Sequence, residues 1–163
     1  MIFLGLDPGS ERTGYGIVEK HPRSKLKCLV YGCITTPRIK SKSERLLLLE
    51  KEIRKLLKKY KPDAAAVESL FFFKNLKTAM PVSEARGVLL LALAQCKIPI
   101  YEFSPLQVKM TIAGYGRAEK KQVQRMVKET LSLQEMPKPD DAADGLAIAI
   151  ACSFSLRGLT RQT

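Results

Sequence analysis

The sequence has no tryptophan, a single histidine (His21) and four scattered cysteines that include no CxxC pair. These cysteines are Cys28, Cys33, Cys96 and Cys152. A structural zinc site needs about four Cys or His ligands at close spacing, so this pattern argues against zinc. Cysteines in such positions are typical of a reduced protein in which the thiol packs as a small hydrophobic group. We therefore expect a cytoplasmic location.

Long hydrophobic runs are also missing. The longest, such as 88–94, is far shorter than the roughly 20 apolar residues that cross a bilayer. Asp7, Glu11 and Arg12 interrupt the N-terminus before the core of a signal peptide could form. We therefore expect neither a membrane-spanning helix nor a secretory signal.

Acidic residues are scarce. The 163 residues contain 28 Lys and Arg against 16 Asp and Glu, which gives a net charge of +12 and a pI near 9.7. This excess favours polyanionic partners, with nucleic acid first and an anionic membrane surface second. The length predicts one domain over residues 1–156, followed by a short basic tail at 157–163.

The hydrophobic pattern predicts an α/β fold with five strands. Three strands in succession at the N-terminus indicate an antiparallel meander, and the crossover helix after them makes the fourth strand parallel to the first. We expect the strands at 2–6, 13–18, 26–35, 64–67 and 98–103. The expected helices are 43–60, 78–95, 105–112, 118–131 and 140–156. Gly14 and Gly16 loosen the second strand where another backbone or a ligand could approach closely.

Four carboxylates occupy unusual positions in this pattern. Asp7 and Glu68 each end a buried strand, and the two strands are expected to be neighbours. Asp141 and Asp144 lie one turn apart on an otherwise apolar helix that has no Lys or Arg at helical spacing to pair with them. Converging carboxylates without His or Cys form a hard oxygen site that suits Mg²⁺ or Mn²⁺, and two ions in it could cleave a phosphodiester bond.

Alternatives to a catalytic site remain at this stage. The carboxylates could form a structural ion site, or one could cap a helix while the others pair with lysines distant in sequence. The run Phe71, Phe72, Phe73 precedes a lysine, and it could stack on an unpaired base or form a hydrophobic plug beneath a loop. Helix 78–95 is apolar almost all round in its second half, which fits either a core helix or a subunit interface.

The motifs together resemble RuvC-type Holliday-junction resolvases. The resemblance covers nearly the whole chain with its motifs in order, which makes it specific, whereas DPG alone would be weak. It is carried by LGLDPGSERTGYG at the start, VES with Phe71, EARG at 84–87, QVK at 107–109, GYGRAEKKQVQ at 114–124 and DDAADGLAIAIA at 140–151.

The resemblance implies a ribonuclease H-like fold, with a five-stranded mixed sheet flanked by helices. It implies a homodimer that nicks four-way DNA junctions symmetrically with Mg²⁺ or Mn²⁺, leaving 5′-phosphate and 3′-hydroxyl ends, in homologous recombination and repair. A branch-migration complex of the RuvA and RuvB type is an implied partner, and helix 78–95 an implied dimer contact.

The resemblance also assigns residues. Asp7, Glu68, Asp141 and Asp144 match the family's catalytic, metal-binding carboxylates, with Asp140 as a minor alternative to Asp141. Phe71 matches the aromatic residue that stacks at the opened junction centre, and Lys109 and Lys120 match basic positions near the cut strand.

Three other functions stay open on the sequence. A ribonuclease H-like nuclease acting on RNA or RNA–DNA hybrids would share the carboxylates. An actin-like or sugar-kinase ATPase also begins with a strand, an Asp and a Gly-rich turn, although 163 residues leave no room for its second domain. A non-catalytic, architectural junction-binding protein would share the basic charge.

Overall fold

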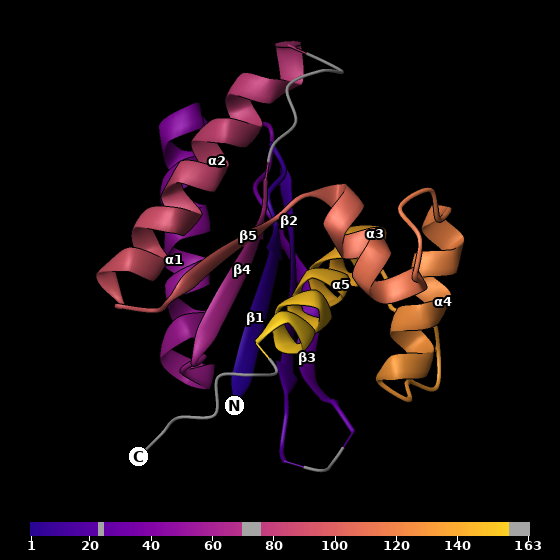
Figure 1. Ribbon diagram of the computed structural model, residues 1–163. Coiled ribbons are helices and arrows are strands. Elements are labelled where there is room, and N and C mark those ends of the chain that lie inside the picture. The colour runs from indigo at the N-terminus through magenta and orange to yellow at the C-terminus, as the bar shows by residue number, and fades with distance from the viewer. Residues whose placement is uncertain (23–24, 70–75, 157–163) are drawn as a thin grey trace.

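A five-stranded sheet forms the centre of the structure, a computed structural model that describes residues 1–22, 25–69 and 76–156 (Figure 1). The strands lie in the order β3–β2–β1–β4–β5. The first three are antiparallel neighbours, and β4 and β5 are added in parallel beside β1. The predicted mixed sheet is thus confirmed. The strands are β1 (Ile2–Asp7), β2 (Arg12–Glu19), β3 (Lys27–Thr35), β4 (Ala64–Glu68) and β5 (Ile100–Phe103).

Five helices accompany the strands in the described residues, close to where the hydrophobic pattern places them. They are α1 (Lys42–Tyr60), α2 (Leu76–Gln95), α3 (Pro105–Ala113), α4 (Lys120–Thr130) and α5 (Asp140–Ser155). Ser104 caps α3 by accepting a hydrogen bond from the Gln107 backbone N–H, and Pro105 opens the helix. None of the described helices combines the length and apolar character needed to cross a bilayer.

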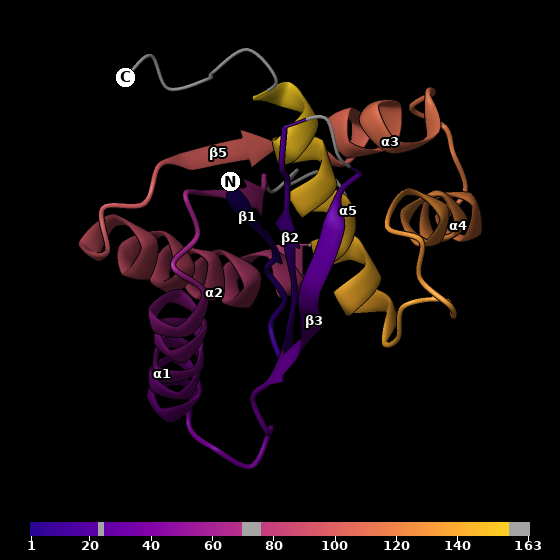
Figure 2. The same ribbon diagram turned by 90° about the horizontal axis from the view of Figure 1, so that it is seen from below.

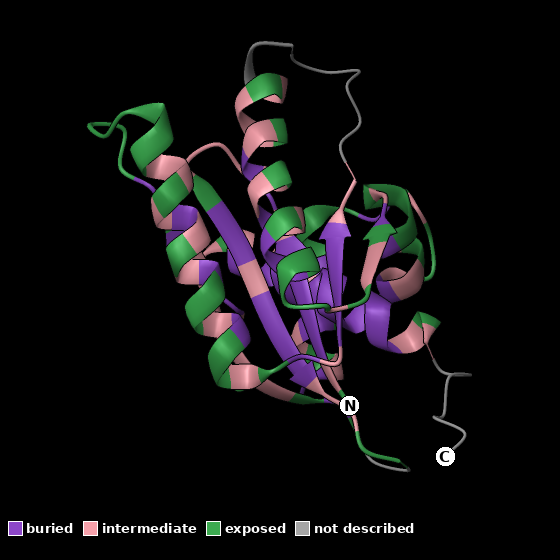
Figure 3. Cartoon of the chain, turned by 90° about the vertical axis from the view of Figure 1, so that its left-hand side faces the viewer, coloured by how far each residue is buried: buried purple, intermediate pink, exposed green. Residues whose placement is uncertain are grey.

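The helices cover both faces of the sheet. Figure 2 shows α1 and α2 on one side, and α5 with α3 and α4 on the other. Strand residues alternate between the two cores: Leu4 and Leu6 pack towards α1 and α2, whereas Phe3 packs towards α5. Figure 3 shows the central strands buried and the outer faces of the helices exposed. The sheet is therefore the rigid base on which both layers are fixed.

Helix α2 presents one face to the core and another to solvent. Leu89 and Leu93 are fully buried, whereas Leu91 is 56% exposed. The core interpretation of this helix is therefore confirmed for one face. The exposed apolar residues on the other face keep a subunit contact as a prediction.

Glycines let α5 lie directly on the backbone of β1 and β2. A Cβ atom added at Gly14 would stand 1.8 Å from the carbonyl oxygen of Asp141, and one at Gly16 would stand 2.6 Å from the Leu146 Cα. Any larger side chain would push the helix away from the sheet. The predicted close approach at these two glycines is thus an approach by α5, which carries the acidic residues.

Candidate active site

The register of β1 and β4 places two carboxylates side by side at the C-terminal ends of these strands. Leu6 of β1 pairs with Val67 of the parallel strand β4, and each strand ends one residue later, at Asp7 and Glu68. Neighbouring parallel strands lie about 4.8 Å apart and side chains at matched positions point the same way. Both carboxylates therefore project on the α5 side of the sheet, as the neighbouring-strand prediction requires.

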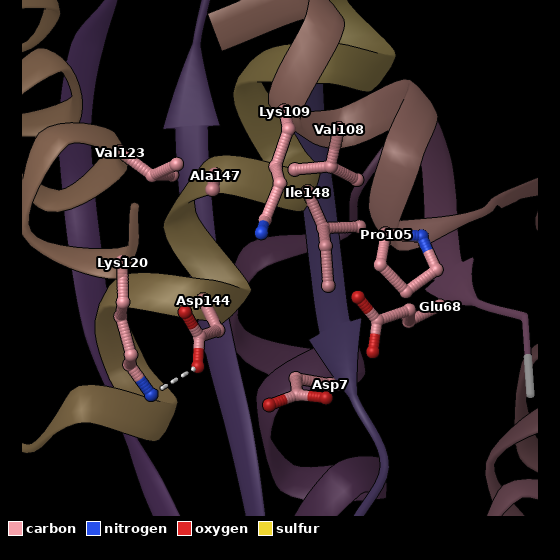
Figure 4. A pocket seen from close by; sticks show the side chains of 10 residues that line it. All are labelled: Asp7, Glu68, Pro105, Val108, Lys109, Lys120, Val123, Asp144, Ala147 and Ile148. Atoms are coloured by element: carbon pink, nitrogen blue, oxygen red, sulfur yellow. Dashed lines mark hydrogen bonds and ion pairs between the residues drawn. The ribbon is translucent and has the colours of Figure 1, made fainter. Parts of the chain in front are cut away.

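Helix α5 adds a third carboxylate to the same pocket. Asp144, one turn into α5, faces Asp7 and Glu68 across a cavity of about 250 Å³ (Figure 4). Lys109 of α3 and Lys120 of α4 line the same cavity. Five of the residues predicted from sequence thus meet in one pocket, although they come from five different elements.

A lysine distant in sequence neutralises part of this acidic cluster. Lys120 Nζ lies 3.1 Å from Asp144 Oδ2 and 3.5 Å from Asp140 Oδ2. Asp140 also accepts a hydrogen bond from the Gln124 amide at 3.0 Å and has a side chain that is 67% exposed. Asp140 therefore lies at the rim and does not line the pocket.

Asp141 is turned away from the pocket. Its Oδ2 lies 2.9 Å from the Arg12 guanidinium, and together they line a separate hollow beside Pro139. The structure thus brings three of the four predicted carboxylates together directly and places the fourth on the adjacent side of α5. Pairing with a lysine distant in sequence, the alternative raised by the sequence, describes Asp144, whereas the partner of Asp141 is an arginine, Arg12.

Burial and mutual repulsion disfavour the charged forms of the three pocket carboxylates. Burial, followed by the charge of Glu68, raises the pKa of Asp7 to about 8. Burial and Asp144 raise the pKa of Glu68, and burial raises that of Asp144 against the opposing effect of Lys120. With all three carboxylates ionised, the pocket would hold more negative charge than its two lysines balance, so additional positive charge would stabilise the ionised form.

The donor set fits a hard divalent cation. All donors are carboxylate oxygens, the ligands that Mg²⁺ and Mn²⁺ prefer. In the described part of the chain, however, no three Asp, Glu, His or Cys side chains already stand in a metal-binding arrangement. Lys120 and Arg12 explain this, since each draws an aspartate of α5 towards itself.

Binding of Mg²⁺ at pH 7 should release about one proton, because Asp7 is protonated below its pKa of about 8 and must ionise to bind a metal. Apparent metal affinity should therefore rise with pH until about 8. Calorimetric titration in PIPES and Tris would measure this as a buffer-dependent heat. A titration at pH 9, in borate and Tris, is the control, since Asp7 is mostly ionised there; equal heats in PIPES and Tris at pH 7 would contradict the prediction.

Arg12 is a residue of the site that the sequence analysis does not predict. Arg12 opens β2 after a short turn from Asp7, so the hairpin register, in which Asp7 pairs with Gly14, is the sequence signal that would place Arg12 near the site.

Phe71, Phe72 and Phe73 lie outside the described residues, and so does the predicted basic tail at 157–163.

A mixed sheet of this order, with acidic residues ending β1 and β4 and a third on α5, defines a nuclease of the ribonuclease H-like class. A family model described as crossover junction endodeoxyribonuclease RuvC matches residues 3–152. The chain belongs to the RuvC family of crossover junction endodeoxyribonucleases, which implies dependence on a divalent metal.

Relatives match over almost their whole length. A crossover junction endodeoxyribonuclease RuvC of Desulfitobacterium hafniense is 52% identical over 162 residues, covering 99% of this chain and 98% of the relative. One from Thermosipho melanesiensis is 53% identical over 157 residues, covering 96% and 99%. Among solved structures, Thermus thermophilus RuvC in complex with Holliday junction substrate is 34% identical, with a TM-score of 0.91 and coverage of 96% of this chain and 95% of that one.

Proposed function

We propose that this chain resolves four-way DNA junctions by hydrolysing one phosphodiester bond in each of two equivalent strands. The observation that carries the proposal is the pocket in which Asp7, Glu68 and Asp144 meet Lys109 and Lys120, in a chain of net charge +12. The near full-length match to the RuvC family supports the junction as the substrate. The basic surroundings attract the phosphate backbone, and the acidic centre is where cleavage occurs.

The pocket carboxylates would hold the catalytic ions. Asp7 stands on a buried central strand beside the other acidic groups, so it would hold Mg²⁺ or Mn²⁺ together with them. Glu68 and Asp144 would complete the coordination, and Asp141 would join them after leaving Arg12. When bound, such ions activate water for attack on phosphorus and stabilise the leaving oxygen, which gives 5′-phosphate and 3′-hydroxyl ends.

The two lysines act on the substrate. Lys109 and Lys120 line the same pocket as the carboxylates, so both can contact phosphate oxygens of the strand that enters it (Figure 4). Their charge favours the additional negative charge that develops during in-line displacement. The ammonium group of Lys120 has three N–H donors, so it can contact a phosphate beside Asp144, and its full charge acts on the phosphate once the pair with Asp144 is broken.

A labelled four-way junction tests this function. The protein should nick two opposing strands in Mg²⁺ and should not do so in EDTA. A linear duplex of the same sequence and an RNA–DNA hybrid are the matched controls, and both should be cut much more slowly. Preferential cutting of the hybrid would indicate a ribonuclease instead, and binding of the junction without any nicking would indicate an architectural protein.

The exposed apolar face of α2 supports a homodimer, which would place one active site on each of two equivalent strands. Leu91 is 56% exposed and Met80 is 69% exposed on this helix. The two residues lie about three helical turns apart on the same side of α2, which leaves this side available for an apolar contact between subunits. The family resemblance favours the same helix.

Leu91→Glu should convert the dimer to a monomer, because a buried, unpaired carboxylate at a subunit contact costs several kcal/mol. Sedimentation equilibrium would measure this as a rise of at least tenfold in the dimer dissociation constant. Leu47→Glu is the control, since it introduces the same charge at a residue of α1 that is 68% exposed. A dimer that persists in Leu91→Glu would place the interface elsewhere.

A further inference from the structure

A groove lined by basic residues lies beside the active-site pocket and outside it. It runs between α4 and residues 136–140, with a volume of about 560 Å³. Four cationic side chains line it: Lys121, Arg125, Lys128 and Lys138. We refer to these four residues and the space between them as the α4 groove. We propose that the α4 groove binds the phosphate backbone of the duplex arm that leads away from the cut strand.

The α4 groove adjoins the active-site pocket. Lys120 lines the catalytic pocket and Lys121, the next residue of α4, lines the groove, so the two sites are adjacent. Helix α4 forms the outer edge of its layer and lies on the opposite side of the sheet from α1 (Figures 1 and 2). A DNA strand that leaves the pocket on the Lys120 side would therefore meet α4 next. This inference rests on the proposed function, because it needs DNA in the pocket.

Three cationic residues of α4 form a row along the helix. Lys121, Arg125 and Lys128 follow one another at intervals of four and three residues, which places them on one side of the helix. From the first to the last they span about 10 Å along the helix axis, at 1.5 Å per residue. Duplex DNA carries one phosphate per strand for about every 3.4 Å of its axis. The row of cations therefore matches about three base pairs of duplex.

The cationic side chains of the α4 groove are available to bind phosphates. Within the described residues, neither Lys121 nor Lys128 forms an ion pair. Arg125 pairs with Glu129 at 3.1 Å, but both side chains are more than half exposed, and such a pair is worth at most about 1 kcal/mol. Asp140 at the groove edge is already held by Gln124 and Lys120. The cations can therefore transfer to phosphates at little cost.

The test is a triple substitution, Lys121→Gln, Arg125→Gln and Lys128→Gln, which removes charge from two exposed positions and one half-buried position outside the pocket and leaves Lys120 in place. Junction binding is measured by fluorescence anisotropy in EDTA between about 50 and 200 mM NaCl. The slope of log affinity against log salt should fall in magnitude by about 2–3, since each lost phosphate contact contributes about 1. Cleavage at saturating protein should stay within about twofold of wild type.

Helix α1 offers a matched control. Lys51, Lys55 and Lys58 have the same four- and three-residue spacing, and Lys55 pairs with Glu52 much as Arg125 pairs with Glu129. The corresponding triple Gln variant removes the same net charge from the other side of the molecule. This variant should change the slope of log affinity against log salt by less than half of the change that the α4 triple variant produces. Equal effects of the two variants would mean that only net charge matters, and would overturn the inference.

A footprint locates the contact. On the wild-type complex, hydroxyl-radical protection should extend along the arm beyond the cut strand, and the α4 variant should lose about three base pairs of it. An unchanged footprint and an unchanged salt slope would show that the groove is a solvated face or binds a protein. Both measurements are repeated on linear duplex, so the groove is tested even if the wild-type protein fails to nick junctions, which would contradict the proposed function alone.

Discussion

Asp7→Asn should lower the rate of junction cleavage by about 10³-fold or more while junction binding persists. The amide has the same shape as the carboxylate but cannot supply the negative charge that holds a divalent ion. Asp7 shares the pocket with Glu68 and Asp144, and the charges of both act on it. Removing the Asp7 carboxylate should therefore weaken metal binding throughout the pocket. Single-turnover cleavage at saturating protein, with binding measured separately in EDTA, gives the two quantities.

The same substitution should stabilise the protein in EDTA at alkaline pH. The pKa of Asp7 is raised from its ordinary value near 3.8 to about 8, so the folded protein holds a proton that the unfolded chain has lost. The stability that this proton contributes is present in full below pH 4 and disappears as pH rises through 8. Asn carries no such charge. Urea unfolding at pH 9 should show a gain of about 1–3 kcal/mol for Asp7→Asn.

Asp140→Asn is the control for both measurements. Asp140 is an exposed aspartate at the start of α5, paired with Lys120 and Gln124 but absent from the lining of the pocket. Its substitution should leave cleavage within about threefold of wild type. A loss as large as that of Asp7→Asn would make Asp140 a ligand, and full activity in Asp7→Asn would remove Asp7 from the site.

Gly14→Ala should destabilise the protein by about 3 kcal/mol or more and reduce cleavage as well. The added methyl group would stand 1.8 Å from the Asp141 carbonyl oxygen and 2.4 Å from its carbonyl carbon, and neither backbone atom can rotate away. The first turn of α5 must therefore lift from β2, and it would carry Asp141 and Asp144 with it. Thermal unfolding and cleavage rate are the two measurements.

The matched control is Gly87→Ala on α2. A Cβ atom at Gly87 meets no heavy atom within 4 Å, so the substitution adds the helix-forming preference of alanine without a clash. Because Gly87 lies one turn from Leu91 on the proposed subunit contact, both glycine substitutions are compared in the Leu91→Glu background, where Gly87→Ala should raise the unfolding free energy by about 0.5–1 kcal/mol. Similar stability of Gly14→Ala and wild type would show that α5 does not lie on the sheet as described.

The strand-end carboxylates could be predicted from the sequence because local rules determine their positions. A buried strand that ends in Asp or Glu before a turn can be recognised directly, and the crossover helix makes β1 and β4 parallel neighbours. Matched register then brings Asp7 and Glu68 together. Helical periodicity likewise places Asp144 on an apolar helix that must pack against the sheet.

The orientation of Asp141 could not be predicted in the same way. Periodicity puts it on the same face as Asp144, but a helix face is broad and each side chain turns towards its own nearest cation. Arg12 and Lys120 come from β2 and α4, and the packing that brings them to α5 depends on glycine contacts between distant segments. Tertiary electrostatics, which helical spacing does not encode, therefore decide this part of the site.

The ion pair between Lys120 and Asp144 makes substrate and metal binding interdependent. One ammonium group cannot serve the carboxylate and a DNA phosphate fully at the same time. A phosphate that draws Lys120 away leaves Asp144 free for a cation, and a cation on Asp144 frees Lys120 for the phosphate. By thermodynamic linkage each partner must raise the affinity for the other by the same factor. The protein thus needs no moving domain for DNA and the metal to favour each other's binding.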